Sequence, residues 1–240
     1  MIQQNNVQRN TELAEIKIDN EAKFYTKLRN ELIIKLIKKT NSKEVIDMGC
    51  GTGKTTVELF NHFDISGCDI SEELLEIARK KSDKINFIKD DMRTIKSEKK
   101  YDCALFLGVT EHIEDDVEVL KNTKNILKGG GYIIIEVPAF MFLWSKRDES
   151  LGHYRRYTKK ILKQKLEDSG YEIVFMKYWK FSMLFGTLLT KILKREEYPY
   201  GVLNPLTRKA IGFWFKYLEN NFIFPIGETI YVIARKKEWE

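Results

Sequence analysis

The segment Val45–Gly53 joins an apolar run, an acidic residue and three glycines, and it is the part of the chain best suited to bind a ligand. The run ends with Asp47, and glycines follow at Gly49, Gly51 and Gly53. Glycines after a strand let the backbone turn sharply and approach a ligand where a Cβ atom would collide. We interpret the segment as a ligand-binding turn, with a tight turn of purely structural importance as the alternative.

The spacing of these glycines separates the ligand classes that use such turns. A phosphate-binding loop would end at Gly53-Lys54-Thr55, but its first glycine would then fall on Met48. The dinucleotide pattern G-x-G-x-x-G would place its third glycine on Lys54. The complete pattern is acidic-x-Gly-x-Gly-x-Gly. It resembles the first motif of the class I S-adenosylmethionine-dependent methyltransferases.

This resemblance implies S-adenosylmethionine as the cofactor and S-adenosylhomocysteine as its product. The cofactor carries an ammonium group, for which the Asp47 carboxylate is a charge-assisted partner. Asp69 ends the second expected strand, where the family binds the ribose hydroxyls. Asp91, with Asp90 as the competing acid, would meet the adenine amino group. The other cofactor-binding positions that the resemblance implies are Ile70, Met92, which would pack on the adenine ring, Leu107 and Gly108.

A second polar group follows the fifth expected strand and could serve the methyl acceptor. The run Gly152–Tyr157 resembles a Gly-His-x-Arg-Arg-Tyr element of a bacterial subset of these enzymes, which act on small molecules or on glycan and lipid intermediates. A histidine here could deprotonate an acceptor hydroxyl, and an arginine could hold a carboxylate or phosphate. We expect His153 and His112 to be catalytic, and Tyr154, Arg155, Arg156 and Tyr157 to bind substrate. The alternative is that the arginines pair with surface acids and the tyrosines pack.

The cysteine spacing and the apolar patterning of the chain limit the metal sites, disulfides and compartments that we expect. Cys50, Cys68 and Cys103 are widely spaced and form no C-x-x-C pair, so we expect no disulfide framework, no thiolate zinc site and no metal. Residues 1–10 contain no apolar signal region, and no stretch reaches the roughly 18–20 apolar residues of a membrane span. We therefore expect a cytoplasmic chain.

The elements that must position these residues alternate between strands and helices. Apolar runs of strand type are separated by helical patterns, which is typical of a parallel sheet covered on both faces. The resemblance implies a Rossmann-like α/β fold with a seven-stranded, mostly parallel sheet whose last strand is antiparallel. Expected strands cover 44–48, 65–68, 85–88, 103–107, 132–137, 171–176 and 228–234, with a turn at Gly129-Gly130-Gly131 before the fifth of them. Expected helices cover 20–40 with Asn20 as N-cap, 115–127, and segments capped by Ser71 and Thr158.

The chain of 240 residues reads as a single domain, 1–240. We expect a mobile N-terminus over 1–19, an N-terminal helix over 20–40, a cofactor-binding core over 41–176 and a lid or substrate elaboration over 177–240 that includes the last strand. The net charge is +6, and the core is slightly acidic while both ends are basic. Phe181–Leu193 is an apolar helical run that could be a lid, a dimer surface or a membrane contact.

The expected function is transfer of a methyl group from S-adenosylmethionine to an oxygen or nitrogen of a small molecule, by a monomer or homodimer. Three alternatives stay open: a peripheral-membrane enzyme acting on a lipid-linked or glycan intermediate, an RNA or DNA methyltransferase, and a catalytically silent binding module. Nucleic acid is disfavoured because Leu107–Thr110 lacks the Pro-Pro-aromatic tetrad that the resemblance would require, and no cysteine follows a proline.

Overall fold

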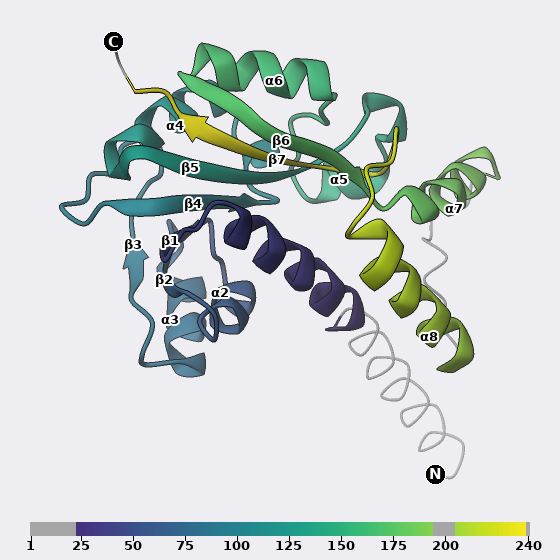
Figure 1. The fold of residues 1–240 in the computed structure, drawn as a ribbon, viewed down its shortest axis with the longest axis horizontal. Helices are drawn as coiled ribbons and strands as arrows, with labels where there is room; N and C mark the ends of the chain where they lie inside the picture. Colours follow the sequence, from purple (N-terminus) through teal and green to yellow (C-terminus); the bar gives the residue numbers. More distant parts are fainter. Residues whose placement is uncertain (1–22, 194–204, 239–240) are drawn as a thin grey trace, which may run out of the picture.

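The described part of the chain is built on one seven-stranded sheet (Figure 1). The structure, a computed structural model, describes residues 23–193 and 205–238. The strand order is β3-β2-β1-β4-β5-β7-β6, and β7 runs antiparallel to β5 and β6 while the other neighbours are parallel. The predicted fold class is confirmed. The strands are β1 (Glu44–Met48), β2 (Asp64–Asp69), β3 (Phe87–Lys89), β4 (Tyr101–Leu107), β5 (Leu127–Pro138), β6 (Tyr171–Trp179) and β7 (Thr229–Lys236).

Helices cover both faces of this sheet (Figure 1). Residues 23–39 form the N-terminal helix, which packs with α2 on one face, whereas α4 and α6 pack on the other. Ser71 and Thr158 cap α3 and α6 as predicted, each accepting a backbone N–H three residues on. The helices are α2 (Lys54–Leu59), α3 (Glu72–Lys81), α4 (Asp116–Thr123), α5 (Lys146–Ser150), α6 (Lys159–Asp168), α7 (Phe181–Ile192) and α8 (Pro205–Phe213), with short turns η1 (Thr110–His112), η2 (Lys124–Ile126), η3 (Met141–Leu143) and the π-helical η4 (Trp214–Glu219).

Successive side chains of the central strands point to opposite faces of the sheet, so the apolar core forms two layers. In β5, Ile133 and Ile135 pack with Leu162 of α6, while Ile134 packs with Leu32 of the N-terminal helix. All five of these side chains are at most 1% exposed. Burial on both faces explains why these strands read as unbroken apolar runs.

Three sequence-based boundaries differ from the structure by three residues or more: the end of the helix expected over 115–127, the start of the strand expected over 132–137 and the end of the strand expected over 171–176. The helix expected over 115–127 ends at Thr123, and after η2 the chain enters β5 at Leu127. The three glycines at 129–131 therefore lie inside a strand and do not form the turn before it. Gly130 has a φ of 63°, a backbone conformation that favours glycine inside this strand. The strand expected over 171–176 continues to Trp179.

The C-terminal third contains helices that the sequence analysis did not predict, α8 and η4, beside the predicted α7. Leu184 of α7 is 1% exposed, whereas Phe185 and Leu189 are 59% and 57% exposed, so α7 presents an apolar face to solvent. Within residues 23–193 and 205–238, no helix has the length and apolar character needed to cross a membrane. The expected cap at Asn20 and the expected mobile segment 1–19 lie outside the described residues.

Candidate active site

The glycine turn connects β1 to α2 at the carboxyl edge of the parallel strands. Gly49, Gly51 and Gly53 all have φ values between 53° and 71°, which favour glycine. An added Cβ at Gly49 would lie 2.8 Å from Val109, and one at Gly53 would lie 2.8 Å from Ala78. An added Cβ at Gly51 would have no neighbour within 4 Å. The middle glycine thus faces open space into which a ligand can fit.

Asp47 lies at the carboxyl edge of β1 with 3% of its surface exposed. Its carboxylate accepts a hydrogen bond of 2.7 Å from the Thr56 hydroxyl of α2. Burial raises the pKa of Asp47 to about 6, although the Thr56 hydrogen bond and the charge of Arg29 act in the opposite direction. A cationic ligand group would therefore find a carboxylate here at neutral pH.

Asp69, the last residue of β2, joins its strand to the glycine turn. One carboxylate oxygen accepts from the Gly51 backbone N–H at 2.7 Å, and the other accepts from the Ser71 backbone N–H at 3.0 Å. These bonds fix the carboxylate and leave a further lone pair on each oxygen for a ligand hydroxyl. Ile70 follows with 58% of its surface exposed, which places an apolar side chain on the same edge.

The other predicted cofactor positions lie at the ends of neighbouring strands. Asp91 follows β3, and its carboxylate is held by the Arg93 guanidinium, a contact that lowers the pKa of Asp91. Met92 is partly buried against the main core. Leu107 ends β4, and Gly108 follows with a φ of 75°. The parallel register brings the ends of β1, β2 and β4 to one edge of the sheet.

The second group of predicted site residues lies on η1 and on the loop after α5. The backbone N–H of Tyr154 donates to the Glu111 carbonyl at 2.8 Å, which ties this loop to η1. Tyr157 pairs with Ala139 in a parallel bridge just beyond β5. The contact between Tyr154 and Glu111 brings together segments that lie more than 40 residues apart in the sequence.

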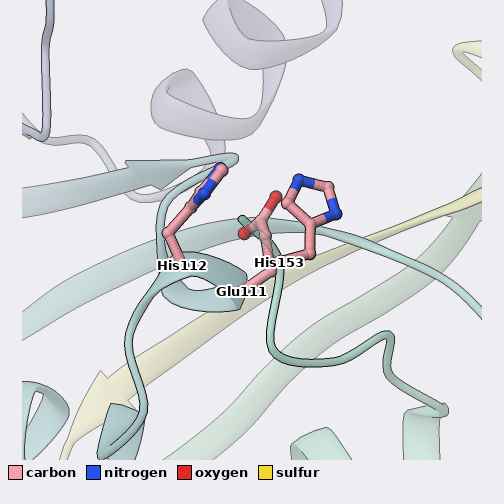
Figure 2. A group of neighbouring side chains, drawn as sticks. All are labelled: Glu111, His112 and His153. Carbon is pink, nitrogen blue, oxygen red and sulfur yellow. The ribbon is translucent and has the colours of Figure 1, made fainter. Parts of the chain in front are cut away.

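Glu111, His112 and His153 converge at this junction (Figure 2). The two imidazole rings meet edge to face with centroids 4.6 Å apart. Burial raises the pKa of the Glu111 carboxyl to about 8, and burial together with the neighbouring His153 lowers the pKa of His112. The predicted histidines therefore lie side by side. The sequence analysis did not assign Glu111 a role.

Asp148 of α5 fixes the orientation of the His153 ring through its Nδ1 atom. Its carboxylate lies 2.9 Å from His153 Nδ1 and receives two hydrogen bonds from Arg156, of 2.8 and 2.9 Å. Burial by itself would raise the pKa of Asp148, but the hydrogen bonds from Arg156 and His153 hold it below its usual value. An ionised Asp148 favours the tautomer with a proton on Nδ1.

Three of the four predicted substrate-binding residues make structural contacts in this loop. Arg156 binds Asp148, and Arg155 reaches the Asp116 carboxylate at 3.2 Å. Tyr157 is fully buried, and its hydroxyl donates to Asp116 at 2.7 Å. Tyr154, by contrast, is 54% exposed. The alternative stated for this run was that the arginines pair with surface acids and the tyrosines pack. Tyr157 does pack, and Arg155 and Arg156 do pair with acids, but these acids, Asp116 and Asp148, are buried.

Arg29 and Glu136 are edge residues that the sequence analysis missed. Arg29 of the N-terminal helix binds Glu136 of β5 at 2.6 Å and also donates to Thr55 and to the Leu107 carbonyl. Burial by itself would lower the pKa of Arg29, but the charge and hydrogen bond of Glu136, together with Tyr231 and Asp47, raise it. An acidic residue inside the apolar run of β5 was the available sequence signal.

A seven-stranded sheet of this order, with an acidic-glycine turn after its first strand, defines the class I S-adenosylmethionine-dependent methyltransferase fold. A family model described as a methyltransferase domain matches residues 20–175, and the chain belongs to that family.

Individual relatives agree with this family. Trans-aconitate 2-methyltransferase of Rhizobium rhizogenes is 29% identical over 102 residues, which cover 41% of this chain and 40% of that protein. Ubiquinone biosynthesis O-methyltransferase of Coxiella burnetii is 30% identical over 95 residues, which cover 37% and 41%. The chain matches about two fifths of the length of these two relatives.

Solved structures share the fold at low sequence identity. An S-adenosylmethionine-dependent methyltransferase from Clostridium acetobutylicum has a TM-score of 0.59 and 16% identity, covering 88% of this chain and 92% of that one. A plantazolicin methyltransferase in complex with a substrate analogue and S-adenosylhomocysteine has a TM-score of 0.62 and 14% identity, covering 95% and 91%. At these identities the comparison establishes the shared fold.

Proposed function

We propose that the chain transfers a methyl group from S-adenosylmethionine to an oxygen or nitrogen atom of a small-molecule acceptor and releases S-adenosylhomocysteine. The observation that carries this proposal is the pairing, on the carboxyl side of one sheet, of the acidic-glycine turn with the Glu111–His112–His153 cluster. The turn would hold the cofactor and the cluster would face the acceptor.

The cofactor's chemistry fits the residues of the turn. The buried Asp47 carboxylate suits its ammonium group, and Asp69 offers hydrogen-bond acceptors to the ribose hydroxyls. The open space beside Gly51 would take the body of the cofactor. Ile70 and Met92 would flank its adenine, with Asp91 at the amino group after rotation of Arg93. Leu107 and Gly108 would lie beneath it.

When bound, the cofactor would supply a methyl group from its positively charged sulfur, and that sulfur would keep the electron pair of the broken carbon–sulfur bond. The chain must align the acceptor, exclude water and, for an alcohol, help to remove a proton. His112 and His153 are the catalytic residues in this proposal, with Asp148 as the group that orients His153. Tyr154 would contact the acceptor, while Arg155, Arg156 and Tyr157 position the loop.

A small molecule is supported as the acceptor by the relatives, two of which are named for trans-aconitate and for ubiquinone biosynthesis. Incubation with methyl-labelled S-adenosylmethionine and fractionated small-molecule extracts should yield a labelled product identifiable by mass, together with S-adenosylhomocysteine. Gly51→Ala, which would enter the cofactor space, is the matched control and should give much less of both at a cofactor concentration that does not saturate the variant. Cofactor binding without any transfer would indicate the silent module. Label recovered in RNA or DNA would contradict the small-molecule assignment.

A peripheral-membrane enzyme is the second candidate, because exposed apolar side chains gather on α7 and α8. Phe185, Leu189 and Ile192 of α7 are 59%, 57% and 76% exposed, and Leu206 and Phe213 of α8 are 80% and 60% exposed. Both helices extend from the end of the sheet near α5 (Figure 1). Exposed lysines of the same segment, Lys209 and Lys216, would suit anionic headgroups.

This candidate predicts sedimentation with vesicles of anionic lipid and weaker sedimentation with neutral vesicles. Phe185→Ser combined with Leu189→Ser should abolish it, since both side chains are more than half exposed and the core-facing Leu184 is kept. Equal amounts of wild type and variant in the pellet would exclude a membrane contact through α7.

A further inference from the structure

We infer that Glu111, His112 and His153 form a binding site for one divalent transition-metal ion. Their potential ligand atoms, a carboxylate oxygen and two imidazole nitrogens, all lie within 4.8 Å of one another. Figure 2 shows the three side chains turned toward one another from η1 and from the loop after α5. Two histidines and one carboxylate are the ligand set of zinc sites with an open coordination position and of non-haem iron sites.

An unpartnered buried atom points to a ligand at this place. Glu111 is 3% exposed, and its Oε2 has no hydrogen-bond partner among the residues that the structure describes. A buried polar atom left without a partner costs about 1–3 kcal/mol, so such atoms are uncommon in folded proteins. A cation bound between Glu111 and the histidines would supply the missing partner.

The surroundings of His153 are those of a metal-binding histidine. Its Nδ1 lies 2.9 Å from a carboxylate oxygen of Asp148, which is 1% exposed and is itself fixed by Arg156. Histidine ligands generally donate their second N–H to such a carboxylate, which fixes the ring and strengthens the remaining nitrogen as a ligand. Nε2 of His153 is therefore the ligand atom, and Asp148 is a positioning residue.

Small side-chain movements complete the coordination. With metal–ligand bonds of about 2.0–2.2 Å, ligand atoms around an ion lie roughly 3–4 Å apart. His112 is exposed and its ring is hydrogen-bonded to the Leu151 backbone, so a rotation toward Glu111 changes this surface contact and displaces no core residue, while His153 stays fixed by Asp148. The sequence-based expectation of no metal rested on cysteine spacing and did not weigh this oxygen and nitrogen set.

The consequence for the acceptor rests on the proposed function. Three protein ligands leave coordination positions for an oxygen of the acceptor, and coordination lowers the pKa of a hydroxyl. In the metal-loaded site His153 acts as a ligand, and the hydroxyl proton passes to solvent. The acceptor class is therefore one with an oxygen donor beside the methylated atom.

Ion binding can be tested without any methyl transfer. Full-length protein, purified without a metal-affinity tag and treated with chelator, is titrated with Zn²⁺ by calorimetry and with Co²⁺ by visible absorption. We expect one ion per chain and a Co²⁺ spectrum of nitrogen and oxygen ligation. His112→Ala and His153→Ala should each weaken binding at least about tenfold, whereas His62→Ala, which removes the exposed third histidine, should not.

Two results would overturn the site. One is the absence of stoichiometric binding of either ion to the wild type, and the other is unchanged binding by the His112→Ala, His153→Ala double variant. Titration of the same variants with S-adenosylmethionine keeps the two proposals apart, because the cofactor turn is intact in each of them. Cofactor binding without ion binding would refute the metal site alone, and ion binding without methyl transfer would refute the proposed function alone.

Discussion

The ionisation of Asp47 should link pH to cofactor binding. Burial places the pKa of this carboxyl at about 6, so the ionised fraction rises as the pH passes upward through that value. An ammonium group is attracted by the ionised form and not by the neutral form. The affinity for S-adenosylmethionine should therefore fall as the pH is lowered from 7 to about 5.

Calorimetric titration at a series of pH values measures this effect. Asp47→Asn should bind weakly at every pH and show little dependence over the same range, since its side chain is neutral throughout. An affinity of the wild type that stays constant below pH 6 would contradict a role for Asp47 at the ammonium group.

The Arg29–Glu136 pair is a further residue-scale feature with a measurable consequence. The two side chains are 22% and 12% exposed, and their charged atoms are 2.6 Å apart. Arg29→Met would leave the Glu136 carboxylate with little solvent and without its cation, which should lower the free energy of unfolding by about 3–5 kcal/mol. Urea unfolding measures the change.

A surface pair provides the control for this prediction. Lys163 and Glu167 lie on α6 with 58% and 42% exposure and a separation of 3.7 Å. Lys163→Met should change the free energy of unfolding by no more than about 1 kcal/mol. Similar losses of unfolding free energy in Arg29→Met and Lys163→Met would show that the Arg29–Glu136 pair stabilises the fold no more than a surface pair does.

At the scale of elements, the glycine turn must pack closely against its neighbours at Gly53 and must leave space for a ligand at Gly51. Gly53→Ala would place a Cβ 2.8 Å from Ala78 at a φ of 69°, so it should destabilise the fold by roughly 2–5 kcal/mol. Gly51→Ala meets no neighbouring atom within 4 Å at a φ of 53°, so its cost to stability should be only about 1–2 kcal/mol. Its cofactor affinity should nevertheless fall at least tenfold, because the new Cβ occupies the ligand's space.

Thermal unfolding and cofactor titration of the two variants distinguish these effects. The expected pattern is a large fall in stability for Gly53→Ala and a large fall in affinity with a small fall in stability for Gly51→Ala. Retained affinity in Gly51→Ala would mean that the cofactor does not approach the middle glycine.

Local patterns predicted the elements where local chemistry determines them. The strand–helix alternation and the caps at Ser71 and Thr158 follow from apolar spacing and from side-chain hydrogen bonding within a few residues. The sequence predicts a turn at 129–131 because glycine commonly ends elements, but these residues lie inside β5, where the Gly130 carbonyl accepts a hydrogen bond from Arg235 of β7, about 100 residues away. A contact of that kind leaves no local signal.

At the scale of the whole molecule, one part of the candidate site is predicted by local sequence motifs and another part is formed only by tertiary contacts. Asp47, Asp69 and the glycines form a motif within one βα unit and its neighbour, so they could be proposed from the sequence. The meeting of Glu111 with His153 depends on a hydrogen bond between the Tyr154 backbone and η1, and the burial of Tyr157 depends on Asp116 in α4. Because of such tertiary contacts, the arginines of the loop that was expected to bind substrate form ion pairs with acidic residues of the protein.

Charge distribution also belongs to this scale. The net charge of +6 would allow a nucleic-acid partner, but the carboxylates Asp47, Asp69 and Asp91 lie at the edge of the sheet where the proposed methyl transfer would take place. We expect no retained complex with RNA or DNA in gel-shift experiments at low salt, where non-specific binding is strongest. A tight complex that weakens steeply with salt would revive the nucleic-acid alternative.

Binding of S-adenosylmethionine to the acidic-glycine turn is the central claim, and calorimetry of wild type and Asp69→Ala tests it most directly. One cofactor should bind per chain, and removal of the Asp69 carboxylate should weaken binding at least about tenfold, since charge-assisted hydrogen bonds to the ribose are lost. Asp64→Ala, at the exposed start of the same strand, should bind as the wild type does. Equal affinities of wild type and Asp69→Ala, or no binding heat for the wild type, would contradict the account.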